Sequence, residues 1–253
     1  MAELSTVRYI DYDKEKIDKG VHGQMRRVAI SQQGEIVGIH DKDNTNLWED
    51  GSEVDWSRYE EDGWNCMVQI PQVYYKVEQG TYGVLEDVRR WSVSSVPSEG
   101  FKLHPAFRRS IGTYNYQYLS AFEGWVDEYQ RLRSLPNKVV SNNLTRAEFR
   151  DHARMNTAEG WAQQDFHLTS LIQLLIITEF GTLDSQSVLG NGGSNQNTGR
   201  SLTNGNNSTQ AGVSNYMSYR GIENLYGNKY KWVDGANISN RNWHISDNYK
   251  DYV

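Results

Sequence analysis

The chain has 253 residues, a length that suffices for a sizeable core without disulfide or metal staples. Aromatic residues make up 12% of it, including 8 Trp and 16 Tyr. Lys and Arg number 26 against 32 Asp and Glu, so the formal net charge is −6, with both signs mixed along the sequence. This balance argues against nucleic acid or an anionic membrane as the main partner, because neutralising phosphates requires clustered basic residues. It also argues against disorder, since disordered chains are poor in large aromatic residues.

The sequence contains a single cysteine, Cys66, so neither an intramolecular disulfide nor a cysteine-based zinc site can be built. Cys66 begins an apolar segment, where we expect a buried, unreactive thiol. The N-terminus lacks the apolar run of a signal peptide, and the longest apolar stretch, residues 171–177, is far shorter than the roughly 20 residues of a membrane helix. We therefore expect synthesis in a reducing cytoplasm and no membrane insertion.

Strand-like alternation begins at Arg26. Residues 26–40 predict two short strands around Gly34, residues 66–83 predict two more, and residues 111–125 predict a third strand region. Between the first two pairs, the segment 41–63 is rich in Asp, Asn and Glu, and we interpret it as a loop.

Two helices are predicted in the middle of the chain. Thr145 and Glu148 have the spacing of a capping box, which predicts a helix from Thr145 to about Asn156. After Asp165, apolar residues recur at helical spacing over 168–180, and Gly181 follows as a stop signal. The second segment is hydrophobic nearly all round, so we expect it to be the buried central helix.

A long Gly- and Asn-rich segment, residues 190–212, is interpreted as a loop, and aromatic strand signals resume at Tyr216. The elements together predict an α+β fold, with two helices packed on small, twisted, mostly antiparallel sheets joined by long loops. We assign residues 21–253 to one domain and residues 1–20 to an N-terminal arm or attachment segment.

The segment 219–238, YRGIENLYGNKYKWVDGANI, resembles the late-strand signature of the C-type-lectin and formylglycine-generating-enzyme superfamily. The resemblance implies that Gly227 and Asn228 turn into a strand whose Tyr230 and Trp232 belong to the core. Further segments are similar, in the same order, to phage tail and prophage proteins of that fold: MRRVAIS, CMVQIPQVYYKV, GFKLHPAF, YLSAFEG, GWAQQDF and EFGTLDSQSVLG. Members of the superfamily usually continue beyond this strand, so the chain is either a short version or a piece of a longer tail protein.

Catalysis is not expected. The enzymes of the superfamily use a pair of active-site cysteines or three histidines, whereas Cys66 is alone and no two histidines are three or four residues apart. Lectins of this fold that bind sugars through calcium carry an EPN or QPD loop, and no proline follows Pro136. We therefore predict no enzyme activity, no cofactor and no metal site.

The resemblance implies a host-recognition module of a bacteriophage virion tail, which binds a host cell-surface glycan or a protein receptor without calcium. Expected partners are other tail subunits and further copies of the chain, for example in a trimer. Two alternatives remain: a structural tail or baseplate component that uses the fold for assembly, and an inactive relative of the formylglycine-generating enzymes. The ligand surface is predicted where the loop 190–212 meets the late aromatic segment. Its candidate residues are Asn215, Tyr216, Tyr219, Arg220, Trp243 and Tyr249.

Overall fold

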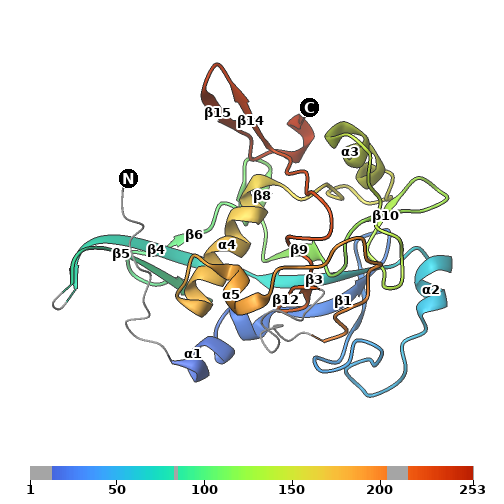
Figure 1. Cartoon of the computed structure of the whole chain (residues 1–253), viewed down its shortest axis with the longest axis horizontal. Helices are drawn as coiled ribbons and strands as arrows, with labels where there is room; N and C mark the ends of the chain where they lie inside the picture. The colour runs from blue at the N-terminus through green and yellow to red at the C-terminus, as the bar shows by residue number, and fades with distance from the viewer. Residues whose placement is uncertain (1–12, 83–84, 204–215, 253) are drawn as a thin grey trace.

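The computed structural model describes residues 13–82, 85–203 and 216–252 (Figure 1). It combines helices with several small antiparallel sheets, so the predicted α+β class is confirmed. The helices are α1 (Lys14–Lys19), η1 (His22–Gln24), α2 (Trp56–Glu61), α3 (Arg146–Arg154), α4 (Phe166–Phe180), α5 (Ser185–Leu189) and η2 (Tyr249–Asp251). The strands are β1 (Arg26–Ile30), β2 (Ile36–Ile39), β3 (Asn65–Pro71), β4 (Tyr74–Tyr82), β5 (Leu85–Ser94), β6 (Lys102–Leu103), β7 (Arg108–Arg109), β8 (Gly112–Thr113), β9 (Tyr116–Ser120), β10 (Trp125–Val126), β11 (Leu132–Arg133), β12 (Ser218–Tyr219), β13 (Ile222–Glu223), β14 (Ala236–Ser239) and β15 (Asn242–Ile245).

The largest sheet is antiparallel and has the strand order β2-β1-β3-β9. Because side chains alternate along a strand, its register defines two faces. The inner face carries residues that belong to the main hydrophobic core, namely Ala29, Cys66, Val68, Ile70 and Leu119. The outer face carries Arg26, Val28, Ile30, Ile39, Met67, Gln69, Tyr116, Tyr118 and Ser120. The predicted strands within 26–40 and 66–83, and the strand region 111–125, are thus confirmed.

Helix α4 supplies much of the core beside the inner face. Asp165 caps its N-terminus by accepting the backbone N–H of Leu168 at 2.8 Å, and Gly181 ends it with a left-handed backbone, φ 60°. Leu171, Ile172 and Leu175 are all 0% exposed. This confirms the predicted central helix, and its end at Phe180 is where the sequence places it.

Helix α3 is capped as the sequence predicts. The hydroxyl of Thr145 accepts the backbone N–H of Glu148, while the Glu148 carboxylate accepts the backbone N–H of Thr145. The predicted loop 41–63 is only partly a loop, because it contains α2, which Asp55 caps through the backbone N–H of Ser57. None of the helices in the described part of the chain is long and apolar enough to cross a membrane.

The N-terminal arm and the Gly- and Asn-rich loop lie partly outside the described residues. Of the arm expected at 1–20, residues 13–20 are described, and they form α1 with its two capping residues, Asp13 and Gly20. Of the loop expected at 190–212, residues 190–203 are described, and they are held by the rest of the fold. Thr198, for example, donates its hydroxyl to the backbone carbonyl of Leu135 at 2.7 Å.

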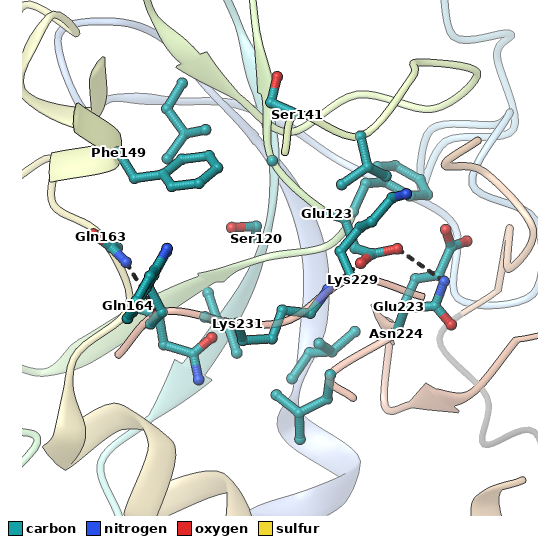
Figure 2. A pocket seen from close by; sticks show the side chains of 18 of the residues that line it. Ser120, Glu123, Ser141, Phe149, Gln163, Gln164, Glu223, Asn224, Lys229 and Lys231 are labelled. Atoms are coloured by element: carbon teal, nitrogen blue, oxygen red, sulfur yellow. Dashed lines mark hydrogen bonds and ion pairs between the residues drawn. The ribbon is translucent and has the colours of Figure 1, made fainter. Parts of the chain in front are cut away.

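The structure describes the segment around Trp232, and the core strand expected there is not formed. The prediction that Tyr230 and Trp232 belong to the core was therefore wrong. Gly227 and Asn228 have positive φ angles of 79° and 47°, as the predicted turn requires, but residues 229–233 form no strand. Tyr230 is fully exposed and Trp232 is 52% exposed. Lys231, between them, reaches the buried Glu123 (Figure 2), whereas its two aromatic neighbours line the hollow around Glu123 and stay exposed.

Candidate functional site

The structure does not bring the predicted ligand-binding residues together. Asn215 lies outside the described residues, and Tyr216 is half-buried. Tyr219 is 0% exposed, with its ring 6.2 Å from that of Phe180, so it belongs to the core and its assignment to the ligand surface was wrong. Its position in the short strand β12 aims the ring inward, which the sequence does not reveal.

Arg220 forms internal ion pairs. Its Nη2 lies 2.5 Å from Glu179 Oε1 and 2.9 Å from Asp18 Oδ1. Burial works against this charge, but the hydrogen bonds to the two carboxylates raise the pKa of Arg220 above its usual value. The guanidinium therefore ties α4 to α1, and Arg220 also lines a hollow, the sheet-edge groove described below.

Trp243 and Tyr249 lie in a different part of the molecule. Trp243 is 63% exposed on β15, at the top of Figure 1, whereas β12 lies near the lower centre. Its ring centroid is 6.0 Å from that of Phe166 at the start of α4. Tyr249, unlike Trp243, lines the aromatic cleft that is described next.

An aromatic cleft of about 460 Å³ lies over one half of the outer face of the main sheet. Its size is within the usual range of small-molecule sites, roughly 300–1,000 Å³. Ile30, Met67 and Tyr118 from the sheet contribute to its floor. Its aromatic lining comes from three distant parts of the chain, and consists of Tyr114, Tyr116, Tyr118, Trp161, Tyr249 and Tyr252.

Polar side chains are built into the lining of the aromatic cleft. Arg109 Nη2 pairs with Asp165 Oδ2 at 2.8 Å, and the Tyr252 hydroxyl donates to the same oxygen at 3.0 Å. Arg109 Nη1 and Gln163 Oε1 are buried and have no hydrogen-bond partner in the part of the chain that the structure describes. Leaving such groups unpaired costs about 1–3 kcal/mol each, so a polar ligand group that reached them would recover free energy.

The charges around the aromatic cleft disfavour an anionic ligand. Asp165, Glu159 and Asp247 line it together with Arg109. Asp165 is neutralised by Arg109, and Glu159 forms an ion pair with Lys250. The balance of the lining is therefore acidic, which disfavours anionic ligands.

A second hollow, which we call the sheet-edge groove, encloses about 720 Å³ beside the aromatic cleft. It is lined by Arg26, Ile39 and Gln69 of the outer face, and by the polar turn that follows β2. Tyr116, which is 46% exposed, lines both hollows. The two hollows therefore meet at Tyr116.

A third, smaller hollow of about 130 Å³ surrounds Glu123 (Figure 2). The Glu123 side chain is 2% exposed, and its Oε2 accepts from Asn224 Nδ2 at 3.0 Å and Asn228 Nδ2 at 2.6 Å. Its Oε1 accepts from Lys231, whose pKa is lowered by burial. Both carboxylate oxygens are thus engaged, and their role is to hold the segment that contains Tyr230 and Trp232.

A buried cysteine and histidine adjoin each other beneath the main sheet. Cys66 Sγ lies 3.7 Å from His40 Nε2, which also lies 2.7 Å from the Tyr59 hydroxyl. Burial raises the pKa of the Cys66 thiol to about 12 and lowers the pKa of His40 to about 4. The neutral thiol is a poor nucleophile, so the prediction that Cys66 is buried and unreactive is supported.

No protein-family model matches this chain, and no curated protein matches its sequence. Tyrosine and tryptophan rings offer flat apolar surfaces with a polar edge, on which the C–H faces of a sugar ring can pack. Among the described residues, no group of three or more His, Cys, Asp or Glu side chains is placed to hold a metal ion.

Proposed function

We propose that the chain is a host-recognition module of a bacteriophage tail, with a C-type-lectin-like fold, that binds an uncharged cell-surface glycan in the aromatic cleft. The carrying observation is the cleft itself, where six aromatic side chains surround a hollow that also contains unpaired polar groups. The phage setting and the lectin-like fold rest on the similarity of the sequence segments described above, to which the α+β class conforms.

Direct hydrogen bonds would take the place of calcium in this binding mode. Among the residues that line the cleft, Arg109 has a buried unpaired donor and Gln163 a buried unpaired acceptor, so a sugar hydroxyl or amide that displaced the atoms covering either could hydrogen-bond to it. Rings on several sides of the cleft would supply most of the binding free energy by packing against the apolar faces of the sugar. We therefore expect binding to persist in the presence of a calcium chelator.

A structural role in tail assembly is the second candidate, and one feature favours it. The hairpin β14–β15 pairs Ile238 with Trp243 and Ala236 with Ile245, so these side chains share one face. Ile238 and Trp243 are 57% and 63% exposed. An apolar hairpin face of this kind suits contact with another tail subunit or with a second copy of the chain.

The glycan proposal is tested with the purified protein on an array of neutral and anionic glycans, followed by titration calorimetry of the neutral glycans retained. Tyr114→Ala and Tyr249→Ala remove rings from the cleft, and each is expected to weaken binding by roughly 30-fold, the effect of removing a central aromatic contact of about 2 kcal/mol.

Tyr129→Ala is the matched control, because Tyr129 is 63% exposed and does not line the cleft. It should bind as the parent does, and all three variants should keep the parent melting temperature. Failure of the folded parent to retain any neutral glycan would refute the proposal. So would cleft variants that bind as well as Tyr129→Ala.

A further inference from the structure

The aromatic cleft and the sheet-edge groove share one floor, the outer face of the main sheet. The register pairs Arg26 with Gln69 and Gln69 with Tyr118, so these three side chains lie in one row across β1, β3 and β9. Arg26 and Gln69 line the sheet-edge groove, whereas Tyr118 lines the aromatic cleft. The row therefore passes from one hollow into the other.

Hydrogen bonds fix this row. Arg26 Nε donates to Gln69 Oε1 at 3.0 Å, and Gln69 Nε2 donates to the Tyr118 hydroxyl at 3.0 Å. Gln69 is only 3% exposed, so it is a buried link between the two hollows, and a ligand would contact its partners Arg26 and Tyr118. Because these two side chains are held in one orientation, less entropy is lost when a ligand binds over them, and the half-exposed Tyr116 ring lies beside them.

The dimensions of the floor exceed what one sugar covers. From β2 to β9 the sheet has three strand spacings of about 4.8 Å, so this direction spans about 14 Å. The sheet-edge groove reaches Ile39 on β2, and the aromatic cleft continues past β9 to Tyr249 and Tyr252. A ligand that used both hollows would need to be an extended chain.

The sheet-edge groove also suits a neutral chain. Its lining mixes acidic and basic side chains, including Asp41, Lys42 and Asp43, and Lys42 pairs with Asp43. Asp41 Oδ1 accepts the backbone N–H groups of Asp43 and Asn44 at 2.9 Å and 2.8 Å, which shapes this turn. Balanced charges and polar edges match hydroxyl groups better than they match phosphates or carboxylates.

We propose that the two hollows are subsites of one groove, and that the ligand is several consecutive units of an uncharged polysaccharide, lying across Tyr116, rather than a single terminal sugar. This inference rests on the proposed function. The aromatic cleft provides the stronger subsite, because it combines the rings with the unpaired Arg109 and Gln163 groups. The sheet-edge groove extends the contact to the units that follow.

The test is titration calorimetry of the full chain with size-fractionated neutral oligosaccharides, namely the dextran, β-glucan, mannan and N-acetylglucosamine series, each from the monosaccharide upward. Affinity is expected to rise at least tenfold from the shortest bound member to the longest, and then to level off when both subsites are filled.

Three variants separate the subsites. Lys42→Ala lies in the sheet-edge groove alone and should weaken only the longer oligosaccharides, whereas Tyr249→Ala lies in the aromatic cleft alone and should weaken every length. Tyr116→Ala should abolish most of the gain with length. Unchanged melting temperatures show that each variant is folded.

The outcomes are distinct. If the shortest bound sugar already has the full affinity, the extended groove is refuted while glycan binding in the cleft stands. If Lys42→Ala weakens all lengths equally, the two hollows are not sequential subsites, and the inference is again overturned. If the folded parent binds none of the four series, both the extended groove and the proposed function are rejected.

Discussion

Asp234 joins the late part of the chain to α3 through a buried ion pair, and replacing it tests how the fold is held. Asp234 Oδ2 accepts from Arg150 Nε at 2.7 Å, and Oδ1 accepts from Arg150 Nη2 at 2.8 Å, with side chains 2% and 6% exposed. Asp234→Asn removes the negative charge and leaves a buried guanidinium without its counter-charge. We expect a loss of about 3–5 kcal/mol in the free energy of unfolding.

In a chain of this length, each kcal/mol corresponds to roughly 2–4 °C in Tm, so Asp234→Asn should melt roughly 6–20 °C below the parent. Urea unfolding followed by tryptophan fluorescence gives the free energy directly. Asp43→Asn is the control, since Asp43 makes its ion pair on an exposed surface and should change stability by no more than about 0.5 kcal/mol.

A double variant, Arg150→Met with Asp234→Leu, removes both charges together and should recover much of the lost stability, because the large penalty comes from the unpaired charge. An Asp234→Asn protein as stable as Asp43→Asn would refute the reasoning. It would mean that Arg150 finds another partner or water when Asp234 is neutral.

Two further predictions concern buried titratable groups. Burial lowers the pKa of His40 and of His104 to about 4, whereas histidine in the unfolded chain titrates near 6.5. Below about pH 6.5 the unfolded chain binds more protons, so the stability present above that pH should decrease toward pH 4, by up to about 1.4 kcal/mol per pH unit for each histidine. Urea unfolding across this range checks it, and a folded His104→Gln variant should show a shallower slope; equal slopes would contradict the assignment. Because burial raises the pKa of Cys66 to about 12, iodoacetamide should leave it unmodified in the native protein and label it fully in urea, and rapid native labelling would show that the sheet opens.

Helices α3 and α4 were predictable because their start and stop signals are local. Thr145 with Glu148, and Asp165 with Gly181, lie next to the helices that they bound, and the structure uses all four as the sequence predicts. Strand β5 was missed because the β4–β5 hairpin is exposed toward its turn, at residues 77–81 and 86, and only its other end packs against the core, through Val93. A hairpin that is buried at one end alone leaves little hydrophobic pattern in the sequence.

The position of Trp232 shows the limit of reasoning from a segment alone. The segment 229–233 forms no strand, so the alternation that was expected to bury Trp232 does not apply. The segment is held instead by the buried carboxylate of Glu123, which pairs with Lys231 and is 108 residues away in the chain. No local pattern around Trp232 contains this information.

The aromatic cleft was mostly missed, because its rings come from segments around residues 114–118, 161 and 249–252. Tyr249 was predicted to bind ligand because of its residue type, and the sequence did not indicate which residues would surround it. One signal was available in the sequence: tyrosines at 114, 116 and 118 recur with period two, which places three aromatic side chains on one side of an extended segment. Such a run on an edge strand is a candidate ligand surface.

The hairpin β14–β15 has a practical consequence for engineering. Its strands pair with each other and with no other strand among the described residues, and its two-residue turn has Asn240 and Arg241 at φ 50° and 64°. Both strands are mostly exposed, so lengthening the turn disturbs no core packing. The tip is therefore a suitable place to graft a foreign epitope or a fluorescent tag, displayed well away from the main sheet (Figure 1).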